Sequence, residues 1–272
     1  MKAGRWMIAV SVFSLIVGQT SAEPAPKPRT EVSGAVYAGL ENFNWKEFEG
    51  GDELLEEDGP LFLAGGFLEI GPKQGIGIKG LAEVYGGTID YDGSTWEGVP
   101  VSSDTSYSGV KGEGTLGLGV QGKQGLYGKP FVGLGLNFWS RELDTDEEGD
   151  QGNLGYDESW STLYGLAGVA GSLEMNEKAK LFGQIALHLP LYNHVEYDFS
   201  NIGGDDRVEV EPDKDFGFLL EAGLVYSSFR IALFYQEMNF GKSDEERVGL
   251  ETVVWQPESE ARIVGLTAGI AF

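Results

Sequence analysis

The sequence contains no cysteine, and its basic residues are few. Without cysteine, a disulfide scaffold and metal sites built on thiolates are both excluded. Only 19 Lys and Arg residues stand against 43 Asp and Glu residues, so the formal net charge is −24. Binding to nucleic acid through phosphates needs basic patches, and we therefore expect no nucleic-acid partner for so acidic a chain.

Long hydrophobic runs are also missing, because no uninterrupted apolar segment reaches the roughly 20 residues of a transmembrane helix. The run Trp6–Val17 is shorter; it follows a basic start and precedes small residues that end at Ala22. This order predicts a secretory signal peptide over residues 1–22, with an N-terminal membrane anchor as the alternative. Residues 23–30 contain three prolines and predict an extended periplasmic tail.

What the chain has in abundance is glycine, with 42 residues, and alternating apolar positions. Such glycine content argues against a helical bundle. From Glu31 onward apolar side chains recur at every second position, which is the period of a β-strand with two different faces. We count ten such segments between residues 31 and 272, joined by four tight turns and five longer polar loops. The predicted loops cover residues 46–59, 92–105, 142–158, 200–213 and 243–258.

The last of these segments is the most informative one. Val264, Leu266, Ala268, Ile270 and Phe272 share one face, whereas the other face carries mostly small residues. A final strand that ends on an aromatic residue, with Leu266, Ile270 and Phe272 as its signature, resembles the closing strand of Gram-negative outer-membrane β-barrels. The resemblance implies a cell outer-membrane location, with membrane lipid and lipopolysaccharide as surroundings. It also implies that the barrel assembly machinery recognises this strand; it indicates no specific family.

The fold we predict is all-β: a single antiparallel transmembrane barrel over residues 31–272, most simply of ten strands. Only a closed barrel or helices can satisfy every backbone group in lipid, and this chain has no spanning helix in its pattern. Short periplasmic turns and long acidic extracellular loops complete the bacterial plan. Aromatic residues are expected in two interfacial belts. The outer belt would hold Phe43, Trp45, Tyr107, Trp139, Trp160, Tyr197, Phe199, Phe216 and Phe240, and the periplasmic belt Tyr127, Phe131, Phe182, Tyr226, Phe229 and Phe272.

The second face of the strands carries polar and charged residues, and we predict that they line the lumen. In a narrow barrel, buried charges must be paired and hydrogen-bonded, so a filled interior is one interpretation. A narrow, porin-like channel for ions or small solutes is the other. The predicted lumen network consists of Glu41, Glu69, Lys79, Glu83, Lys111, Glu113, Asn137, Arg141, His188, Glu221 and Arg230.

One loop carries a candidate metal motif. Asp144, Asp146 and Glu148, followed by Gly149 and Asp150, resemble the first part of a calcium-binding EF-hand loop. At the twelfth position of the motif stands Gly155 in place of the bidentate glutamate. Calcium at the acidic loops is therefore the only cofactor we consider, and a solvated charge run is the alternative.

Enzymatic activity would have to rest on the two histidines. His188, His194, Glu196 and Asp198 have even spacing, which would place them on one wall of a strand. A His–carboxylate pair can act as a general base, so a barrel-rim hydrolase is one hypothesis. The sequence shows no nucleophile elbow and no counterpart of the paired dyads of the ten-stranded omptin proteases. We therefore expect a non-enzymatic barrel whose acidic surface meets divalent cations, envelope polysaccharide or a surface partner.

Overall fold

The computed structural model describes residues 30–94, 100–144, 155–200, 207–248 and 252–272. The predicted signal peptide and most of the Pro-rich tail, up to residue 29, lie outside these ranges. No helix in the described ranges is long and apolar enough to cross a membrane.

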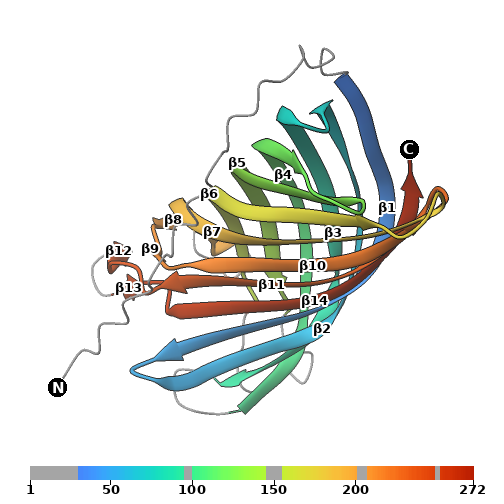
Figure 1. Cartoon of the computed structure of the whole chain (residues 1–272). Helices are drawn as coiled ribbons and strands as arrows, with labels where there is room; N and C mark the ends of the chain where they lie inside the picture. The colour runs from blue at the N-terminus through green and yellow to red at the C-terminus, as the bar shows by residue number, and fades with distance from the viewer. Residues whose placement is uncertain (1–29, 95–99, 145–154, 201–206, 249–251) are drawn as a thin grey trace.

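Ten long strands form one closed antiparallel barrel, as the alternation predicts (Figure 1). Each strand pairs with the next along the chain, and the last strand pairs with the first, so the wall has no free edge. A closed wall satisfies all backbone donors and acceptors without water. The ten strands are β1 (Thr30–Glu49), β2 (Asp52–Pro72), β3 (Gly75–Ser94), β4 (Pro100–Gln121), β5 (Leu126–Leu143), β6 (Asp157–Glu174), β7 (Ala179–Asp198), β10 (Gly217–Tyr226), β11 (Phe229–Gly241) and β14 (Glu258–Ala271).

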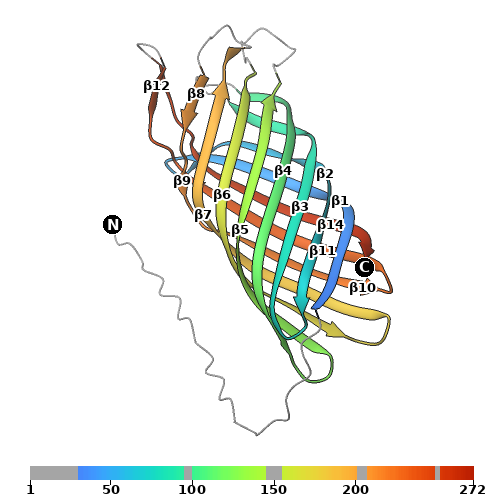
Figure 2. The same cartoon turned by 90° about the horizontal axis from the view of Figure 1, so that it is seen from above.

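Four short strands lie at the long-loop end of the barrel (Figures 1 and 2). There β8 extends the wall from β7, and β9 extends it from β11, while β12 and β13 form a separate hairpin. The wall between β7 and β11 is thus completed by β10 near the short turns and by β8 and β9 at the other end. The bounds of the short strands are β8 (Arg207–Val210), β9 (Asp213–Lys214), β12 (Glu246–Val248) and β13 (Thr252–Val254).

The closing strand β14 joins β1 over a long register that runs from Phe48–Glu258 to Ala35–Ala271. The backbone of Phe272 adds two hydrogen bonds to Gly34, with N–O distances of 2.9 and 3.0 Å. Leu266, Ile270 and Phe272 all point outward and are 51 to 66 % exposed. The predicted apolar signature of this strand therefore lies on the outer surface of the barrel.

The outer surface carries an apolar band that surrounds the barrel. Outward residues of every long strand are apolar or glycine in this band, and many are more than half exposed, up to 72 % at Ile76. An apolar face this exposed fits contact with lipid chains rather than with water. Toward the long loops the band ends at one level, where the next outward residues become polar: Asn42, Asp58, Thr88, Ser108, Ser140, Ser161, His194, Glu237 and Arg262.

The strands continue well beyond the apolar band. On β1, residues 42–49 lie past its edge, and at about 3.4 Å per residue this adds a substantial outer extension of the barrel wall. The predicted loop over residues 46–59 is therefore wrong: β1 runs to Glu49, β2 starts at Asp52, and a two-residue turn joins them. Gly50 and Gly51 have φ values of 61° and 95°, which a type I′ hairpin turn requires. Most of the predicted loop over 92–105 is likewise strand in β3 and β4.

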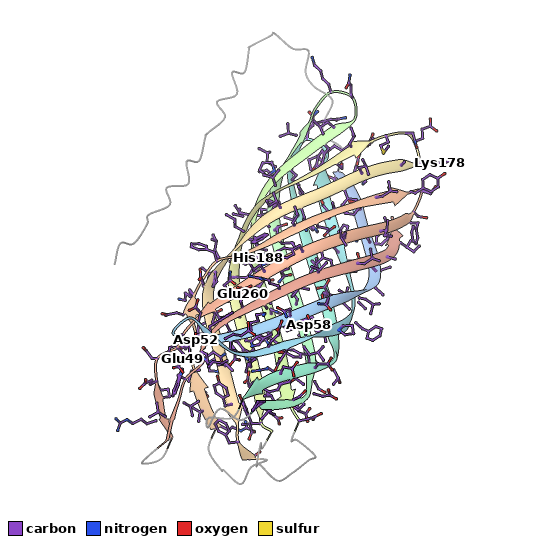
Figure 3. The ribbon with its side chains drawn as sticks, turned by 90° about the horizontal axis from the view of Figure 1, so that it is seen from below. Glu49, Asp52, Asp58, Lys178, His188 and Glu260 are labelled. Atoms are coloured by element: carbon purple, nitrogen blue, oxygen red, sulfur yellow. The ribbon has the colours of Figure 1, made fainter. Side chains whose placement is uncertain are left out.

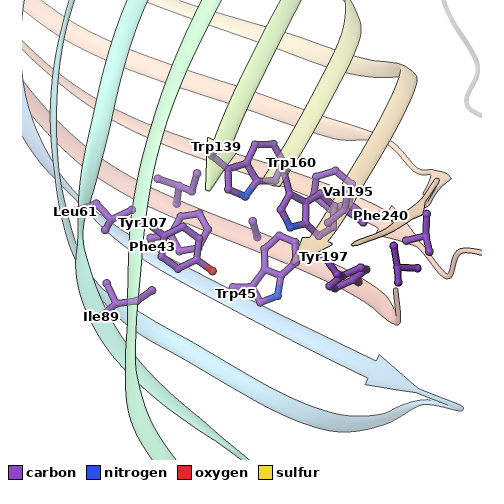
Figure 4. Close-up of a cluster of buried hydrophobic side chains, with 14 residues drawn as sticks. Phe43, Trp45, Leu61, Ile89, Tyr107, Trp139, Trp160, Val195, Tyr197 and Phe240 are labelled. Atoms are coloured by element: carbon purple, nitrogen blue, oxygen red, sulfur yellow. The ribbon is translucent and has the colours of Figure 1, made fainter. Parts of the chain in front are cut away.

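The interior of this outer extension holds a hydrophobic core (Figure 4). Trp45, Trp139, Trp160 and Phe240 pack against one another there with ring centroids 5.2 to 6.1 Å apart, and Trp139 and Trp160 are stacked. The predicted outer aromatic belt is therefore wrong for most of its members, because seven of the nine rings are buried inside: Phe43, Trp45, Tyr107, Trp139, Trp160, Tyr197 and Phe240. Above the lipid band the outside of the wall faces water, so the apolar rings are stable only on the inside.

The periplasmic belt is half correct. Tyr226, Phe229 and Phe272 face outward and are 51 to 66 % exposed. Tyr127, Phe131 and Phe182 instead line a cavity inside the barrel.

Candidate functional site: an interior in two parts

Arg141 is the centre of the outer part of the interior. Its side chain is 1 % exposed, and its guanidinium contacts the carboxylates of Glu47, Glu57 and Glu158. The closest N–O distances are 2.7 Å to Glu57, 2.7 Å to Glu158 and 3.2 Å to Glu47. All four residues lie above the apolar band, because each is nearer the long-loop end of its strand than the level at which the outward residues become polar. Here a charged centre is enclosed by the aromatic core.

Further donors complete the coordination of the three carboxylates. Glu57 accepts hydrogen bonds from Thr105 at 3.0 Å and from Tyr107. Trp160 Nε1 donates to Glu158 at 2.8 Å, and Trp45 Nε1 donates to Glu47 at 3.0 Å. Buried charges are tolerated only when they are paired and hydrogen-bonded in this way.

Three carboxylates share one guanidinium, so the network has an excess of acid. Burial raises the pKa of Glu47, although Arg141 opposes this rise and Glu158 adds to it. A raised pKa means that the protein favours the protonated, neutral form of Glu47. Gln256 Nε2 donates to Glu47 at 3.2 Å, which ties the segment before β14 to the same network.

Sequence reasoning missed Glu47, Glu57 and Glu158, because it assigned them to loops. A signal was present: Tyr37, Glu41, Phe43, Trp45 and Glu47 continue one period of two without a break. Following that phase past Trp45 would have placed Glu47 on the inner face of a longer strand.

The inner part of the interior, inside the apolar band, is polar. Lys111 pairs with Glu83 at 2.6 Å, and Tyr37 donates to the same carboxylate at 3.0 Å. Tyr85 donates to Asn137, and Tyr164 donates to Glu113, both at 3.0 Å. Nearer the short turns, two further ion pairs lie in the lumen: Lys129 with Glu69 at 2.8 Å, and Arg230 with Glu221.

All eleven residues of the predicted lumen network thus lie on the inner face of the wall. The structure divides them between two levels. Arg141 belongs to the outer network, and the other ten lie within the apolar band, where Lys129 joins them as a partner that the sequence reasoning had not named. Their role in function remains a proposal.

The predicted wall of two histidines and two acids is wrong for His188, whereas His194, Glu196 and Asp198 share the outer face of β7. His188 faces inward, is 4 % exposed and stacks on Tyr164 at 4.8 Å. His194 faces outward and stacks on Tyr192. A bulge at Leu191 causes the change of face, because one unpaired residue reverses the side of every residue that follows. Figure 3 shows His188 between the Lys178 turn and the Glu49–Asp52 tip.

The predicted calcium motif falls mainly outside the described residues, since Asp146, Glu148 and Asp150 belong to 145–154. Asp144 is described and exposed, and its N–H donates to the carbonyl of Asp104 at 3.1 Å. Within the described ranges, no three His, Asp or Glu side chains are grouped so that they could hold a metal ion.

A cavity of about 420 Å³ opens at the short-turn end of the barrel. Its wall combines aromatic rings, among them Phe67 and Phe182, with the cations Lys79, Lys129 and Arg230. Small-molecule sites in proteins have volumes of roughly 300–1,000 Å³, so this cavity is large enough for a ligand.

Comparison with known proteins supports the architecture and leaves the activity open. No protein-family model matches the sequence, and no curated protein matches it. Among solved structures, the outer membrane protease OmpT from Escherichia coli aligns with a TM-score of 0.63 at 12 % identity, over 93 % of this chain and 99 % of OmpT. The translocator domain of the autotransporter NalP from Neisseria meningitidis aligns with a TM-score of 0.44 at 14 % identity, over 86 % of this chain and 88 % of that domain.

The closed ten-stranded wall and the alignment with OmpT show that the chain has the fold of the small single-chain outer-membrane β-barrels. At 12 % identity the likeness to OmpT concerns the fold alone.

Proposed function

We propose that this protein is a non-enzymatic barrel of the cell outer membrane that has a closed lumen and acts through its projecting outer part. The filled outer interior carries the proposal. Trp45 of β1, Arg141 of β5 and Trp160 of β6 are each 1 % exposed, and their side chains extend into the lumen from different sides of the wall. A narrow channel would need a continuous water-filled path, and close-packed rings around a fully paired arginine leave little room for one.

Conductance in planar lipid bilayers tests the closed lumen. The purified, refolded protein is expected to give no discrete current steps in 1 M KCl, where a known porin serves as the positive control. Reproducible single-channel steps from the wild-type protein would contradict the proposal and favour the channel. Heat-modifiable gel migration of the same sample verifies that the barrel is folded.

The positions of the histidines support a non-enzymatic role. His188 is enclosed in the lumen, whereas His194 is on the opposite face of β7, so the two cannot act at one site. A His188→Asn/His194→Asn double variant is expected to leave every measured phenotype of the strain unchanged. Cleavage of a peptide library or of lipid by the wild type, lost in the double variant, would overturn this part.

The outer surface supports contact with envelope components. Asp58, Asp90 and Asp104 lie directly opposite one another on β2, β3 and β4, and the backbone bond to Asp144 continues the row onto the end of β5. All four side chains are exposed. Like charges directly opposite each other repel, and divalent cations relieve such repulsion. The row lies just above the apolar band, so we propose that cations bridge it to lipopolysaccharide phosphates.

Calcium or magnesium titration tests this contact. In lipopolysaccharide-containing vesicles, 5 mM Mg²⁺ should raise the melting temperature of the wild type more than that of Asp90→Asn/Asp104→Asn. The matched control is Glu209→Gln/Glu211→Gln, which removes two exposed charges at β8. Equal responses of all three proteins would reject a role for the aspartate row.

A further inference from the structure

We propose that the cavity at the short-turn end binds a small amphiphilic carboxylate from the periplasmic side, with Lys79 as the residue that receives the carboxylate. This inference goes beyond the closed-lumen function and does not depend on it. Its basis is a half-buried cation, Lys79, that has no carboxylate partner in a cavity where the buried cations Lys129 and Arg230 each have one.

Pairing distinguishes Lys79 from its neighbours. Lys129 has its carboxylate in Glu69, at 2.8 Å, and Arg230 has Glu221 together with the hydroxyl of Thr267 at 3.1 Å. Throughout the described part of the chain, no carboxylate oxygen lies within 4.0 Å of Lys79 Nζ. Both Lys129 and Arg230 already have their counter-charge, so an added anion gains most from Lys79.

The place of Lys79 makes an unpaired charge costly. Its strand neighbours Ile78 and Gly80 lie in the apolar band, so the ammonium group sits inside the membrane-spanning part of the barrel. A charge at this depth is unfavourable unless it is paired or faces a water-filled cavity. Lys79 lines the cavity, which therefore supplies either water or an anionic group.

The rest of the wall suits the apolar part of the ligand. Lys79 Nζ lies 4.6 Å from the centroid of the Phe67 ring, and Phe182 stacks on the guanidinium of Arg230 at 4.6 Å. Phe131, Leu81 and Leu166 add apolar surface to the same cavity. A volume of about 420 Å³ would hold roughly 14 water molecules at about 30 Å³ each, which corresponds to a small organic acid rather than a long lipid.

The glutamates that line the cavity limit how much negative charge a bound ligand can carry. Glu69 and Glu221 are held by Lys129 and Arg230, and Glu113 accepts a hydrogen bond from Tyr164 at 3.0 Å. Among the cations that line the cavity in the described chain, only Lys79 and the exposed Lys180 have no carboxylate within 4.0 Å, so little positive charge is available and a ligand with a single negative charge is favoured. A polyanion would meet repulsion from the carboxylates.

Isothermal titration calorimetry on the full protein in lipid nanodiscs tests the proposal, with 3-phenylpropionate as the probe. The acid should bind, whereas its neutral amide and 3-phenylpropylamine should bind at least about tenfold more weakly, since a hydrogen bond to a charged group is lost. Lys79→Met should weaken binding of the acid by a similar factor, and Lys79→Arg should retain it. The matched control Lys123→Met changes a lysine of a short turn outside the cavity and should bind as the wild type does.

Two further measurements keep the test decisive if Lys79→Met does not fold. Ala170 lines the cavity, and Ala170→Leu should reduce binding by filling the space while keeping Lys79. Inorganic phosphate should compete only weakly, because it lacks the apolar part. Equal binding of acid and amide, unchanged binding in Ala170→Leu, or no heat of binding up to 10 mM probe would each overturn the proposal.

Discussion

The two halves of the barrel interior are built on opposite chemistry. Within the apolar band the lumen is polar, with Lys111 and Glu83 as a central ion pair. Above the band the lumen is aromatic, and a single buried arginine is its only cation among the residues described there. The outer surface changes in the reverse sense, from apolar to polar, at the same level.

This difference shows that the medium outside the wall, lipid or water, determines which kind of side chain faces the lumen. Where lipid covers the outside, apolar side chains gain nothing by moving inward, so the inside can hold charges. Where water covers the outside, apolar burial again drives the rings to the inside, as in a soluble barrel. One continuous strand such as β5 therefore changes its pattern along its length, from Lys129 and Asn137 inside to Trp139.

The largest effect is expected at Arg141. Arg141→Met leaves three buried carboxylates without a cation and should lower the free energy of unfolding by about 3–5 kcal/mol. Urea unfolding followed by tryptophan fluorescence measures this change. Arg207→Met is the control: its side chain is 67 % exposed, although it also pairs with two acids, so its loss should cost about 1 kcal/mol or less. If both variants lose a similar free energy of unfolding, the outer network does not stabilise the protein more than a surface ion pair does.

A smaller effect is expected from arginine on the outer surface of β3. Ala82→Arg places a charge near the middle of the apolar band and should destabilise the folded protein by about 2–4 kcal/mol in a bilayer. Thr88→Arg, on the same strand and face but above the band, should cost about 1 kcal/mol or less. Folding titrations in lipid vesicles compare the two. If both substitutions reduce the free energy of unfolding equally, the level that we assign to the membrane edge is wrong.

The smallest effect concerns the pH dependence of the outer network. Because burial raises the pKa of Glu47 above that of the unfolded chain, the folded state binds its proton more tightly. The stabilising contribution of this group is complete below the unfolded pKa and is lost as the pH rises through the folded pKa. Glu47→Gln keeps an acceptor for Trp45 Nε1 and should flatten the fall of stability above pH 5, relative to wild type.

Thermal melts between pH 4 and 9 measure that slope. Glu49→Gln, an exposed residue at the tip of the same strand, provides the matched control and should follow the wild type. A steeper fall in Glu47→Gln would show that the sign of the assigned shift is wrong.

Much of the architecture was predictable because the membrane imposes a strict alternation. Val264 to Phe272 already showed the lipid-facing side of β14, and the ten strands and the closed wall are confirmed. Local composition placed Glu47 and Glu57 in a loop, since acidic runs usually mark loops, although the period of two extended to Glu47. Their burial depends on Arg141, which lies 84 or more positions away in the chain.

His194 illustrates a second limit. The alternation placed it beside His188, but one bulged residue at Leu191 moved it to the outer face. Pro190, directly before Leu191, is a sign of the bulge, since proline inside a paired strand occurs at bulges, but the alternation alone passes over it.

The sequence by itself determined the period, the number of strands and the face that each apolar residue of the band takes, because a chain without a spanning helix can satisfy its backbone in lipid only as a closed barrel. Only the tertiary structure decided what fills the inside. Which charges meet, where the aromatic core lies and why Lys79 has no carboxylate beside it depend on contacts across the lumen between strands far apart in the chain.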